Sequence, residues 1–245
     1  MKNTAIIIPT RMGAKRFPNK PLAEINGIPM IIHVLNKAKE SKIGEVFVAT
    51  PDDQIANIVK ENGGQAIITK KNHLSGTERI YEVYQKNLIN SVDLIINLQG
   101  DMPNIKPDSI SKLEKLMRKN ESSVGTLASF IKDKNEIMDQ NIVKVQLKEE
   151  LKKDSFLEAK DFFRLKKDLN NEKIYHHIGI YAFTSDALSK YVSLARSKLE
   201  IERNLEQMRF MENGMIINVG FSDSLPLSVD TMEDLKKITE ELEKK

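Results

Sequence analysis

The sequence of 245 residues contains no cysteine, which excludes disulfide bonds, thiolate metal sites and cysteine nucleophiles. It has only 4 histidines, and none of them has the spacing of a zinc site. No apolar run is long enough to span a bilayer, and no secretory leader precedes the first apolar segment. From these absences we expect a cytoplasmic protein with no membrane partner.

The sequence also has little excess charge, with a formal net charge of +3. Lysines are interleaved with acidic residues, most clearly between Lys144 and Lys173. A nucleic-acid-binding surface would gather charge of one sign with aromatic residues between the cations, so we expect no nucleic-acid partner. A hydrophobic content of 40% is ordinary for a globular protein, and the length suffices for one large α/β domain.

The most informative segment is AIIIPTRMGAKRFPNKPLAEING, residues 5–27. Its apolar start predicts a buried parallel strand that ends at Pro9. The loop that follows holds four cations before the first acidic residue, Glu24, namely Arg11, Lys15, Arg16 and Lys20. Ligands of open α/β sheets bind beyond the carboxyl ends of the strands, so this position favours a triphosphate site over a merely solvated basic loop. The loop is neither a Walker A motif nor a G-x-G-x-x-G fingerprint.

Strands and helices alternate through the first half of the chain. Strands are expected at 45–50, 65–69 and 93–98, and helices at 29–40, 51–62, 77–88 and from Pro107 onward. This alternation predicts an α/β fold with a mostly parallel, Rossmann-like sheet flanked by helices.

The second half is less regular. Strands are expected at 123–131, 141–147, 176–183, 215–219 and 229–230, helices at 199–213 and 231–244, and a surface loop or helical excursion at 156–173. Thr231 and Asp234 resemble a capping box at the start of the last helix. With no internal repeat or low-complexity linker, the pattern predicts a single domain over 1–245 with a smaller inserted α/β lobe over roughly 123–214.

Two aspartates follow expected strand ends. Asp101 comes after Gly100, which we expect to let the backbone turn sharply, and Asp230 follows Val229. If both strands belong to the main sheet, both carboxylates face the edge that carries the basic loop. Mg²⁺ commonly takes one or two carboxylates plus substrate phosphates, so the pair suggests a metal–nucleotide site. The alternative is a turn or helix N-cap, to which Asp230 is more open because it precedes a helix.

A second set of polar residues lies in the expected lobe. His177, Gly179 and Tyr181 share one face of the strand at 176–183, which gives a polar surface with room for a ligand. The alternative is an ordinary satisfied or exposed histidine. On the helix at 199–213, Glu206 and Gln207 lie away from the apolar stripe and face either water or a polar ligand. No Ser/His/Asp triad follows from the spacing, and covalent catalysis has little support.

The chain resembles the 3-deoxy-manno-octulosonate (Kdo) cytidylyltransferases, also called CMP-Kdo synthetases, over nearly its whole length. The resemblance rests on IIIPTRMGAKRFPNKPLAEINGIPMI at 6–31, HLSGTER at 73–79, NLQGDMP at 97–103, NIVKVQL at 141–147, YHHIGIYAF at 175–183, LEIERNLEQMRFMENG at 199–214 and LSVDTMEDL at 227–235. Many nucleotidyltransferases share the opening loop, whereas HLSGTER, HHIGIY and LEQMR in this order are specific to the Kdo enzymes.

This resemblance implies a nucleotidyltransferase fold and the reaction of CTP with Kdo to give CMP-Kdo and pyrophosphate for lipopolysaccharide. It also implies a Mg²⁺ cofactor, a homodimer, and a lobe for sugar binding and dimerisation. The matched motifs imply that Arg11 and Lys20 bind the triphosphate, with Lys15 and Arg16 nearby, and that Asp101 and Asp230 bind the metal. They imply that the nucleotide side is formed by Ser75, Arg79 and Gln99. They imply that the sugar is bound by Arg164, His177, Tyr181, Glu206 and Gln207. The match of Arg164 is the loosest.

Two further functions stay open from the sequence. One is a cytidylyltransferase for a related acid sugar, such as 8-amino-Kdo or a sialic acid. The other is a catalytically silent nucleotide-binding protein, against which the joint retention of both cations and both aspartates argues. Departures from the family pattern fall at Thr10, Lys15, Asn19, Met102 and Ser228, and none removes a proposed ligand.

Overall fold

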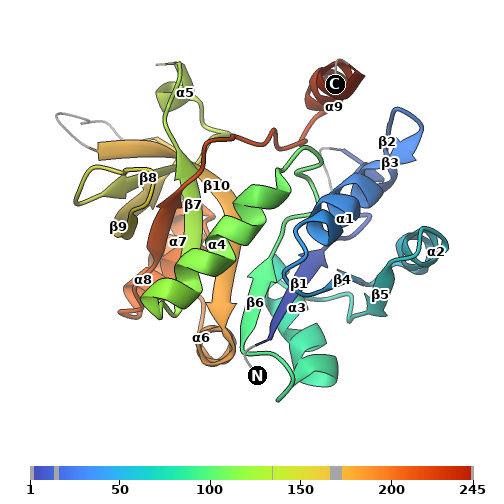
Figure 1. The fold of residues 1–245 in the computed structure, drawn as a ribbon, viewed down its shortest axis with the longest axis horizontal. Helices are drawn as coiled ribbons and strands as arrows, with labels where there is room; N and C mark the ends of the chain where they lie inside the picture. The colour runs from blue at the N-terminus through green and yellow to red at the C-terminus, as the bar shows by residue number, and fades with distance from the viewer. Residues whose placement is uncertain (1–2, 14–16, 134, 166–172, 244–245) are drawn as a thin grey trace. The chain divides into compact units, whose positions relative to one another are not determined.

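The computed structural model describes residues 3–13, 17–133, 135–165 and 173–243. The chain divides into two compact units (Figure 1). Unit 1 comprises Met1–Ser111 and Pro226–Lys245, and unit 2 comprises Lys112–Leu225. In the described part of the chain no helix is both long and apolar enough to cross a membrane.

Unit 1 contains the parallel strands that the alternating pattern predicts. They lie in the order β5, β4, β1, β6, and every pairing among them is parallel. All residues of β1 are buried, because the strand is covered on both faces. This explains its continuous apolar run in place of an alternating pattern. The strands of unit 1 are β1 (Thr4–Pro9), β4 (Glu45–Thr50), β5 (Gln65–Ile68), β6 (Leu94–Asn97) and the hairpin of β2 (Glu24–Ile25) with β3 (Ile28–Pro29).

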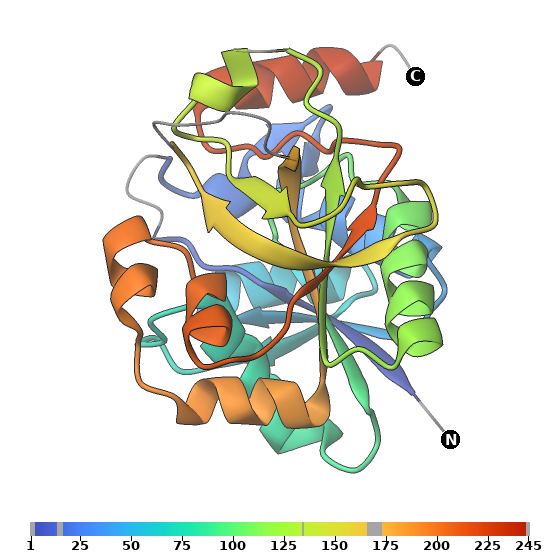
Figure 2. The same ribbon diagram turned by 90° about the vertical axis from the view of Figure 1, so that its left-hand side faces the viewer.

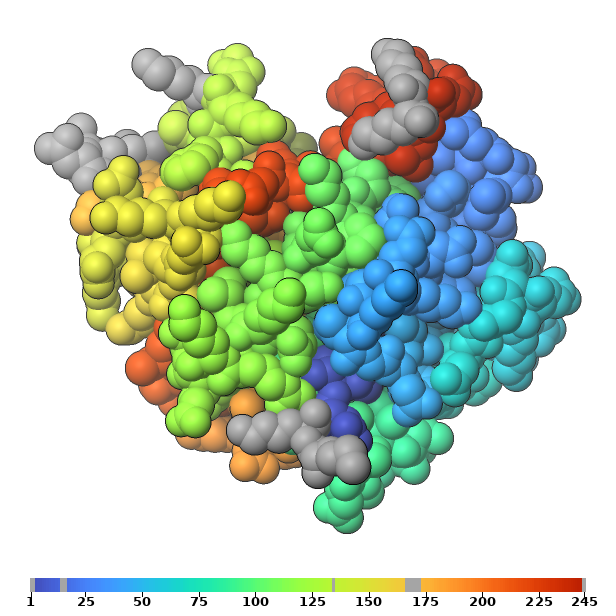
Figure 3. Space-filling model, in the orientation of Figure 1, coloured from blue at the N-terminus to red at the C-terminus, as the bar shows by residue number. Residues whose placement is uncertain are grey.

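The helices of unit 1 begin and end close to their predicted bounds. They are α1 (Met30–Glu40), α2 (Asp53–Glu61), α3 (Gly76–Val83) with a π-helical turn at Tyr84–Leu88, α4 (Pro107–Asn120), which contains the boundary between the units, and α9 (Met232–Glu243). Figure 3 shows α1 and α2 at the surface on this face of unit 1.

The C-terminal segment has a capped helix and packs on the rest of unit 1 through a small apolar cluster. Thr231 Oγ1 accepts from the Asp234 amide at 3.2 Å, and Asp234 Oδ2 accepts from the Thr231 amide at 2.9 Å, so the predicted capping box is confirmed. The cluster consists of Phe17, Ile25, Met30, Val229 and Ile238. It joins the end of the basic loop to the segment that carries Asp230.

Unit 2 is built on mainly antiparallel strands (Figure 2). In the order β10, β7, β11, β9, β8 each strand pairs with the next, and β8 pairs back with β10, so the strands close into a ring. The strands are β7 (Val124–Ser129), β8 (Lys144–Leu147), β9 (Phe156–Phe163), β10 (Lys173–Thr184) and β11 (Asn218–Phe221). The helices are α5 (Asn135–Met138), α6 (Ser185–Ser193), α7 (Lys198–Arg203) and α8 (Gln207–Glu212).

Three expectations from the sequence are wrong. The loop or helix expected at 156–173 is a strand, β9, over its first eight residues, in which Ala159, Phe162 and Phe163 are buried. The single helix expected at 199–213 is interrupted at Asn204, whose φ of 51° is left-handed and ends α7. The strand end expected at 229–230 has no strand geometry.

Candidate active site

Asp101 and Asp230 bind the same cation in unit 1. The Lys20 ammonium donates to Asp101 Oδ2 at 3.0 Å, to Asp230 Oδ1 at 3.1 Å and to the Val229 carbonyl at 2.9 Å. Burial by itself lowers the pKa of Lys20, but the attraction of the two carboxylates outweighs it and raises the pKa above the ordinary lysine value. The basic loop and the two aspartates therefore form one charge cluster, which we call the Lys20 cluster (Lys20, Asp101, Val229 and Asp230).

Local backbone geometry explains why these residues meet. Asn19 has a φ of 58°, a left-handed value that asparagine tolerates better than most residues, and a 3₁₀ turn at Lys20–Leu22 follows. The Val229 amide donates to the Asp101 carbonyl at 2.9 Å, which joins the two aspartate segments without any strand pairing. Gly100 lies in a turn, as expected, although its φ is not in the left-handed region. A Cβ there would lie 3.3 Å from the Pro9 carbonyl oxygen, so close packing explains the glycine.

The Lys20 cluster fits a hard divalent cation. Its acceptors are all oxygens, and an ammonium already occupies the position where they converge. No group of three or more His, Asp or Glu residues that could hold a metal occurs in the part of the chain that the structure describes. A metal held by these two carboxylates would therefore need further oxygen ligands from phosphate or water, as Mg²⁺ usually does.

The basic loop is held at its start by Asp52. The Met12 amide donates to Asp52 Oδ2 at 2.8 Å, and Asp52 makes no capping bond to α2 with its side chain. Arg11 is exposed. Burial has the largest effect in lowering the pKa of Arg79, and the positive charge of Arg11 has the second largest. Lys15 and Arg16 lie outside the described residues.

The residues expected on the nucleotide side have mostly structural partners in this structure. Arg79 is 3% exposed and donates to Thr69 Oγ1 and, at 3.0 Å, to the Lys70 carbonyl. Ser75 is the N-cap of α3 and accepts from the Glu78 amide at 3.1 Å. Gln99 Nε2 donates to Asn97 Oδ1 at 3.2 Å.

A buried glutamate fastens the segment between β5 and α3. Glu82 accepts from the Lys70 amide at 2.9 Å, from Lys86 Nζ at 2.5 Å and from the His73 ring. Burial by itself raises the pKa of Glu82, but these donors lower it to about 2. Glu82 is therefore ionised at neutral pH and holds the HLSGTER segment against its own helix.

In unit 2, His177 is buried and neutral. Burial, with a smaller effect of His176, lowers the pKa of His177 to about 3. Its Nε2 lies 3.0 Å from Thr126 Oγ1, and that hydroxyl lies 2.7 Å from the Ile180 carbonyl oxygen. Because a carbonyl can only accept, the Thr126 hydroxyl donates to it and accepts from Nε2–H. His177 Nδ1 is thereby left as a hydrogen-bond acceptor.

Tyr181 stands beside His177 with its hydroxyl unsatisfied. Alternation places both side chains on one face of β10, and the two rings are 5.4 Å apart across a bulge between Ile178 and Tyr181. Among the described residues the buried Tyr181 hydroxyl has no hydrogen-bond partner. Burial first, and then the nearby Glu206 carboxylate, raise the pKa of Tyr181 well above its usual range. A buried unpaired hydroxyl is costly, and a polar ligand would satisfy it.

The corner between α7 and α8 presents Glu206 and Gln207. Glu206 is the N-cap residue of α8, and Gln207 is buried at its first position. A buried ion pair fixes this corner, since Arg209 donates to both oxygens of Glu200 at 2.7 and 2.6 Å. These bonds, rather than a continuous helix, place the two side chains.

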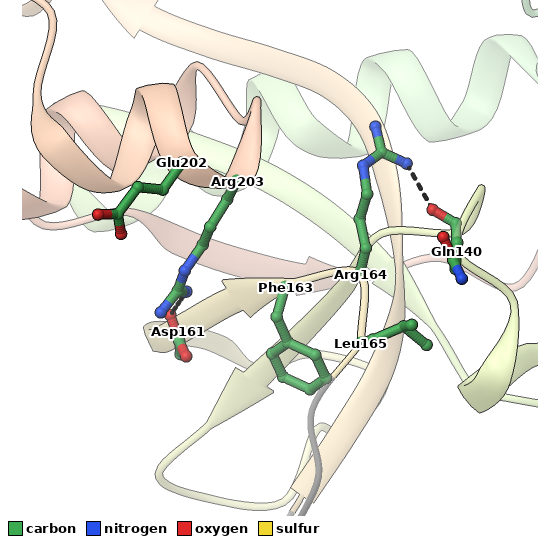
Figure 4. A pocket seen from close by; sticks show the side chains of 7 residues that line it. All are labelled: Gln140, Asp161, Phe163, Arg164, Leu165, Glu202 and Arg203. Atoms are coloured by element: carbon green, nitrogen blue, oxygen red, sulfur yellow. Dashed lines mark hydrogen bonds and ion pairs between the residues drawn. The ribbon is translucent and has the colours of Figure 1, made fainter.

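Arg164 belongs to a different pocket of unit 2. It donates to the carbonyls of Gln140 at 3.1 Å (Figure 4) and Asn141 at 2.9 Å. Neither His177 nor Tyr181 lines this pocket. The pocket has a volume of about 390 Å³, and on its lining Arg203 donates to Asp161 at 2.5 Å. The pocket is lined by Gln140, Asp161, Phe163, Arg164, Leu165, Glu202 and Arg203.

Sequence reasoning missed three residues that support these groups. Asp52 follows the carboxyl end of β4, which is parallel to β1, so both strands end at the same edge of the sheet. This position was the signal in the sequence that could have identified Asp52. Glu82 lies three residues beyond Arg79, and a carboxylate on the buried side of a helix was a weaker signal. Thr126 gave no signal, because its role depends on the bulge in the neighbouring strand.

Comparison with known proteins identifies the family. A cytidylyltransferase family model matches residues 5–217. A 3-deoxy-manno-octulosonate cytidylyltransferase of Rhodopseudomonas palustris (strain BisB18) is 42% identical over 95% of this chain and 95% of its own. The chain belongs to the Kdo cytidylyltransferase family. Another such cytidylyltransferase, from Bartonella tribocorum, is also 42% identical, over 95% of this chain and 96% of its own.

The structural comparison confirms the predicted nucleotidyltransferase fold. The structure of a CMP:2-keto-3-deoxy-manno-octonic acid synthetase in complex with CTP matches with a TM-score of 0.89, 34% identity and 99% coverage of both chains. A 4-diphosphocytidyl-2C-methyl-D-erythritol synthase of Anaerococcus prevotii matches with a TM-score of 0.66 at 14% identity, which supports the fold alone.

Proposed function

We propose that this member of the Kdo cytidylyltransferase family transfers a cytidylyl group from CTP to Kdo, giving CMP-Kdo and pyrophosphate for lipopolysaccharide synthesis in the cytoplasm. The observation that carries the proposal is the Lys20 cluster, in a family whose relatives are named for this activity. The anomeric oxygen of Kdo forms a bond to the α-phosphorus, and the bond from that phosphorus to pyrophosphate breaks. The proton of the anomeric hydroxyl leaves to solvent.

On the nucleotide side, we assign binding of the triphosphate to Arg11 and Lys20, with Lys15 and Arg16 near it. Ser75, Arg79 and Gln99 are proposed to orient base and ribose. Asp101 and Asp230 would hold Mg²⁺, which would supply neutralisation of phosphate charge and Lewis acidity. Little covalent help is needed from the protein, because positioning and charge neutralisation supply most of the catalysis of phosphoryl-type transfer.

On the sugar side, we assign Kdo to the polar groups of unit 2. His177 Nδ1 can accept from a sugar hydroxyl, and the unpaired Tyr181 hydroxyl can donate to one. Glu206 and Gln207 add an acceptor and an amide at the helix corner. Arg164 is assigned to the carboxylate of the sugar, since only its Nη1 donates to the two carbonyls and a guanidinium also carries donors on Nε and Nη2. We place sugar binding and homodimer formation in the lobe at roughly 123–214.

The test is pyrophosphate release by the purified chain with CTP, Mg²⁺ and a panel of sugars. We expect turnover with Kdo, none with neutral sugar phosphates, and loss of turnover on adding EDTA. Parallel assays with 8-amino-Kdo and a sialic acid rank the acid sugars. Turnover that survives EDTA, or that prefers neutral sugar phosphates, would contradict the proposal.

A further inference from the structure

The Lys20 ammonium has no hydrogen left to donate to a phosphate. An ammonium carries three N–H groups, and those of Lys20 meet Asp101 Oδ2, Asp230 Oδ1 and the Val229 carbonyl at 3.0, 3.1 and 2.9 Å. The side chain is 15% exposed. All three hydrogens of the Lys20 ammonium are thus bound by the protein, and they cannot bind a triphosphate at the same time.

The position of this ammonium is imposed by the structure around it. The left-handed Asn19 and the 3₁₀ turn at Lys20–Leu22 set the direction of the backbone, and Pro21 is buried within that turn. From the other side, Val229 is fully buried in the apolar cluster, and its amide is bound to the Asp101 carbonyl. An exposed lysine that meets a carboxylate by chance would have none of these constraints.

Asp101 Oδ2 and Asp230 Oδ1 converge on one position, and the Lys20 ammonium holds it. A divalent ion that bridged these two oxygens would take the position of the ammonium, and an ion at the other oxygens of the same carboxylates would still repel the ammonium by its charge. We propose that Lys20 is a built-in counter-cation that holds the divalent-metal position in the free protein and leaves it when metal and nucleotide bind. This inference rests on the proposed function, because it takes the same carboxylates as metal ligands.

The exchange couples metal binding to nucleotide binding. Without nucleotide, an incoming metal must displace an ammonium that then has no anionic partner, so the free protein binds divalent ions weakly. With nucleotide, the displaced ammonium gains the triphosphate. Each ligand therefore strengthens the binding of the other, as linkage requires. Lys20 then acts in turn as the partner of the carboxylates and as the partner of the phosphates.

The test uses Mn²⁺ alone as the probe, titrated into the full chain without nucleotide and followed by the electron paramagnetic resonance of free Mn²⁺. Lys20→Met keeps the aliphatic stem and removes the charge, and we expect it to bind Mn²⁺ at least about 10-fold more tightly than the wild type. Lys20→Arg keeps a cation and should bind as weakly as the wild type. The matched control is Lys37→Met, since Lys37 is a partly exposed lysine of α1 that pairs with Glu40. Adding Asp101→Asn to Lys20→Met should abolish the gain.

Thermal unfolding of the same variants gives a second readout. Without metal, Lys20→Met leaves two neighbouring carboxylates uncompensated and should lower the Tm, and Mn²⁺ should restore it. Lys20→Gln replaces Lys20→Met if the latter does not fold. If neither variant binds Mn²⁺ more tightly than the wild type, the counter-cation role is wrong. Turnover of Asp101→Asn, measured separately with CTP and Kdo, tests the proposed metal site whichever way Lys20 behaves.

Discussion

The Lys20 cluster of unit 1 is charged and its members satisfy one another, whereas the neutral pair His177 and Tyr181 of unit 2 leaves a polar atom unpaired among the described residues. In the Lys20 cluster every hydrogen of the ammonium has an acceptor. Beside His177, the Tyr181 hydroxyl is buried without a partner in the described part of the chain. A ligand of unit 1 must therefore displace existing ion pairs, while a ligand of unit 2 supplies a bond that the free protein lacks.

The largest effect is expected from removing one charge of the unit 1 cluster. Asp101→Asn and Asp230→Asn keep the shape of the side chain but remove a proposed metal ligand. Turnover should fall at least about 100-fold, which is more than the usual cost of a change to a residue that only supports a metal ligand. The Tm should change little. The matched control is Asp108→Asn, an exposed aspartate of α4, which should stay active. Near-normal turnover of Asp230→Asn would exclude Asp230 from the site. The cap of α9 is Thr231 rather than Asp230, so a loss of turnover could not be explained by a lost helix cap.

The neutral site of unit 2 should instead show itself in the pH dependence of stability. The pKa of His177 is about 3 in the folded chain and about 6.5 when unfolded, so below pH 6.5 only the unfolded state gains the proton. Stability is therefore lost as the pH falls from 6.5 toward 3, by about 2 kcal/mol at pH 5. Denaturant unfolding at pH 7 and pH 5 should show this loss in the wild type and a smaller loss in His177→Gln. Equal losses in both would contradict a buried neutral imidazole.

Removing the unpaired hydroxyl should make unit 2 more stable and a poorer binder. Tyr181→Phe should raise stability by about 1 kcal/mol, because a buried group without a partner disappears, and should raise the KM for Kdo about 10-fold. The matched control is Tyr175→Phe. The Tyr175 oxygen accepts from the Leu151 amide at 2.9 Å, so the same chemical change there should lower the Tm. A lowered Tm in Tyr181→Phe would mean that its hydroxyl has a partner after all.

The smallest effect concerns the support of the basic loop. Asp52→Ala removes the acceptor of the Met12 amide and should raise the KM for CTP about threefold to tenfold, the usual worth of one hydrogen bond. Asp52→Asn keeps an acceptor oxygen and should restore most of the loss. Steady-state kinetics with varied CTP distinguishes the two variants, and equal KM values in wild type and Asp52→Ala would show that the loop does not depend on this bond.

The features set by local pattern were predictable from the sequence. The apolar run of β1 and the capping box at Thr231 depend on neighbouring residues alone, and both are confirmed. The approach of Asp101 to Asp230 followed from assuming two strand ends. The structure achieves it differently, through one bond between the Val229 amide and the Asp101 carbonyl.

The features that depend on distant partners were not predictable. The strand β9 shows no regular alternation of buried and exposed residues, and its pairing with β8 and β11 makes it a strand. The break at Asn204 interrupts a pattern that is otherwise helical, and asparagine in the left-handed region carries little local signal. The Lys20 ammonium lies between the carboxylates of Asp101 and Asp230. This arrangement depends on side-chain positions, which the spacing of residues in the sequence does not determine.

Asp230 reaches unit 1 only through the segment Pro226–Lys245, which the ribosome makes after all of unit 2. Closing the intervening chain of 112–225 costs conformational entropy of about 4 kcal/mol if that chain is still unfolded. The opposing contacts are the Val229 amide bond, the bonds of Lys20 to Val229 and Asp230, two side-chain bonds of Asn104 and one side of a small apolar cluster. This segment is thus among the last parts of unit 1 to dock during synthesis and among the first to detach. Its detachment would leave the parallel strands paired but would remove the Asp230 carboxylate from the Lys20 cluster. Hydrogen exchange at the Val229 amide would therefore report how often the folded chain loses this part of the candidate site.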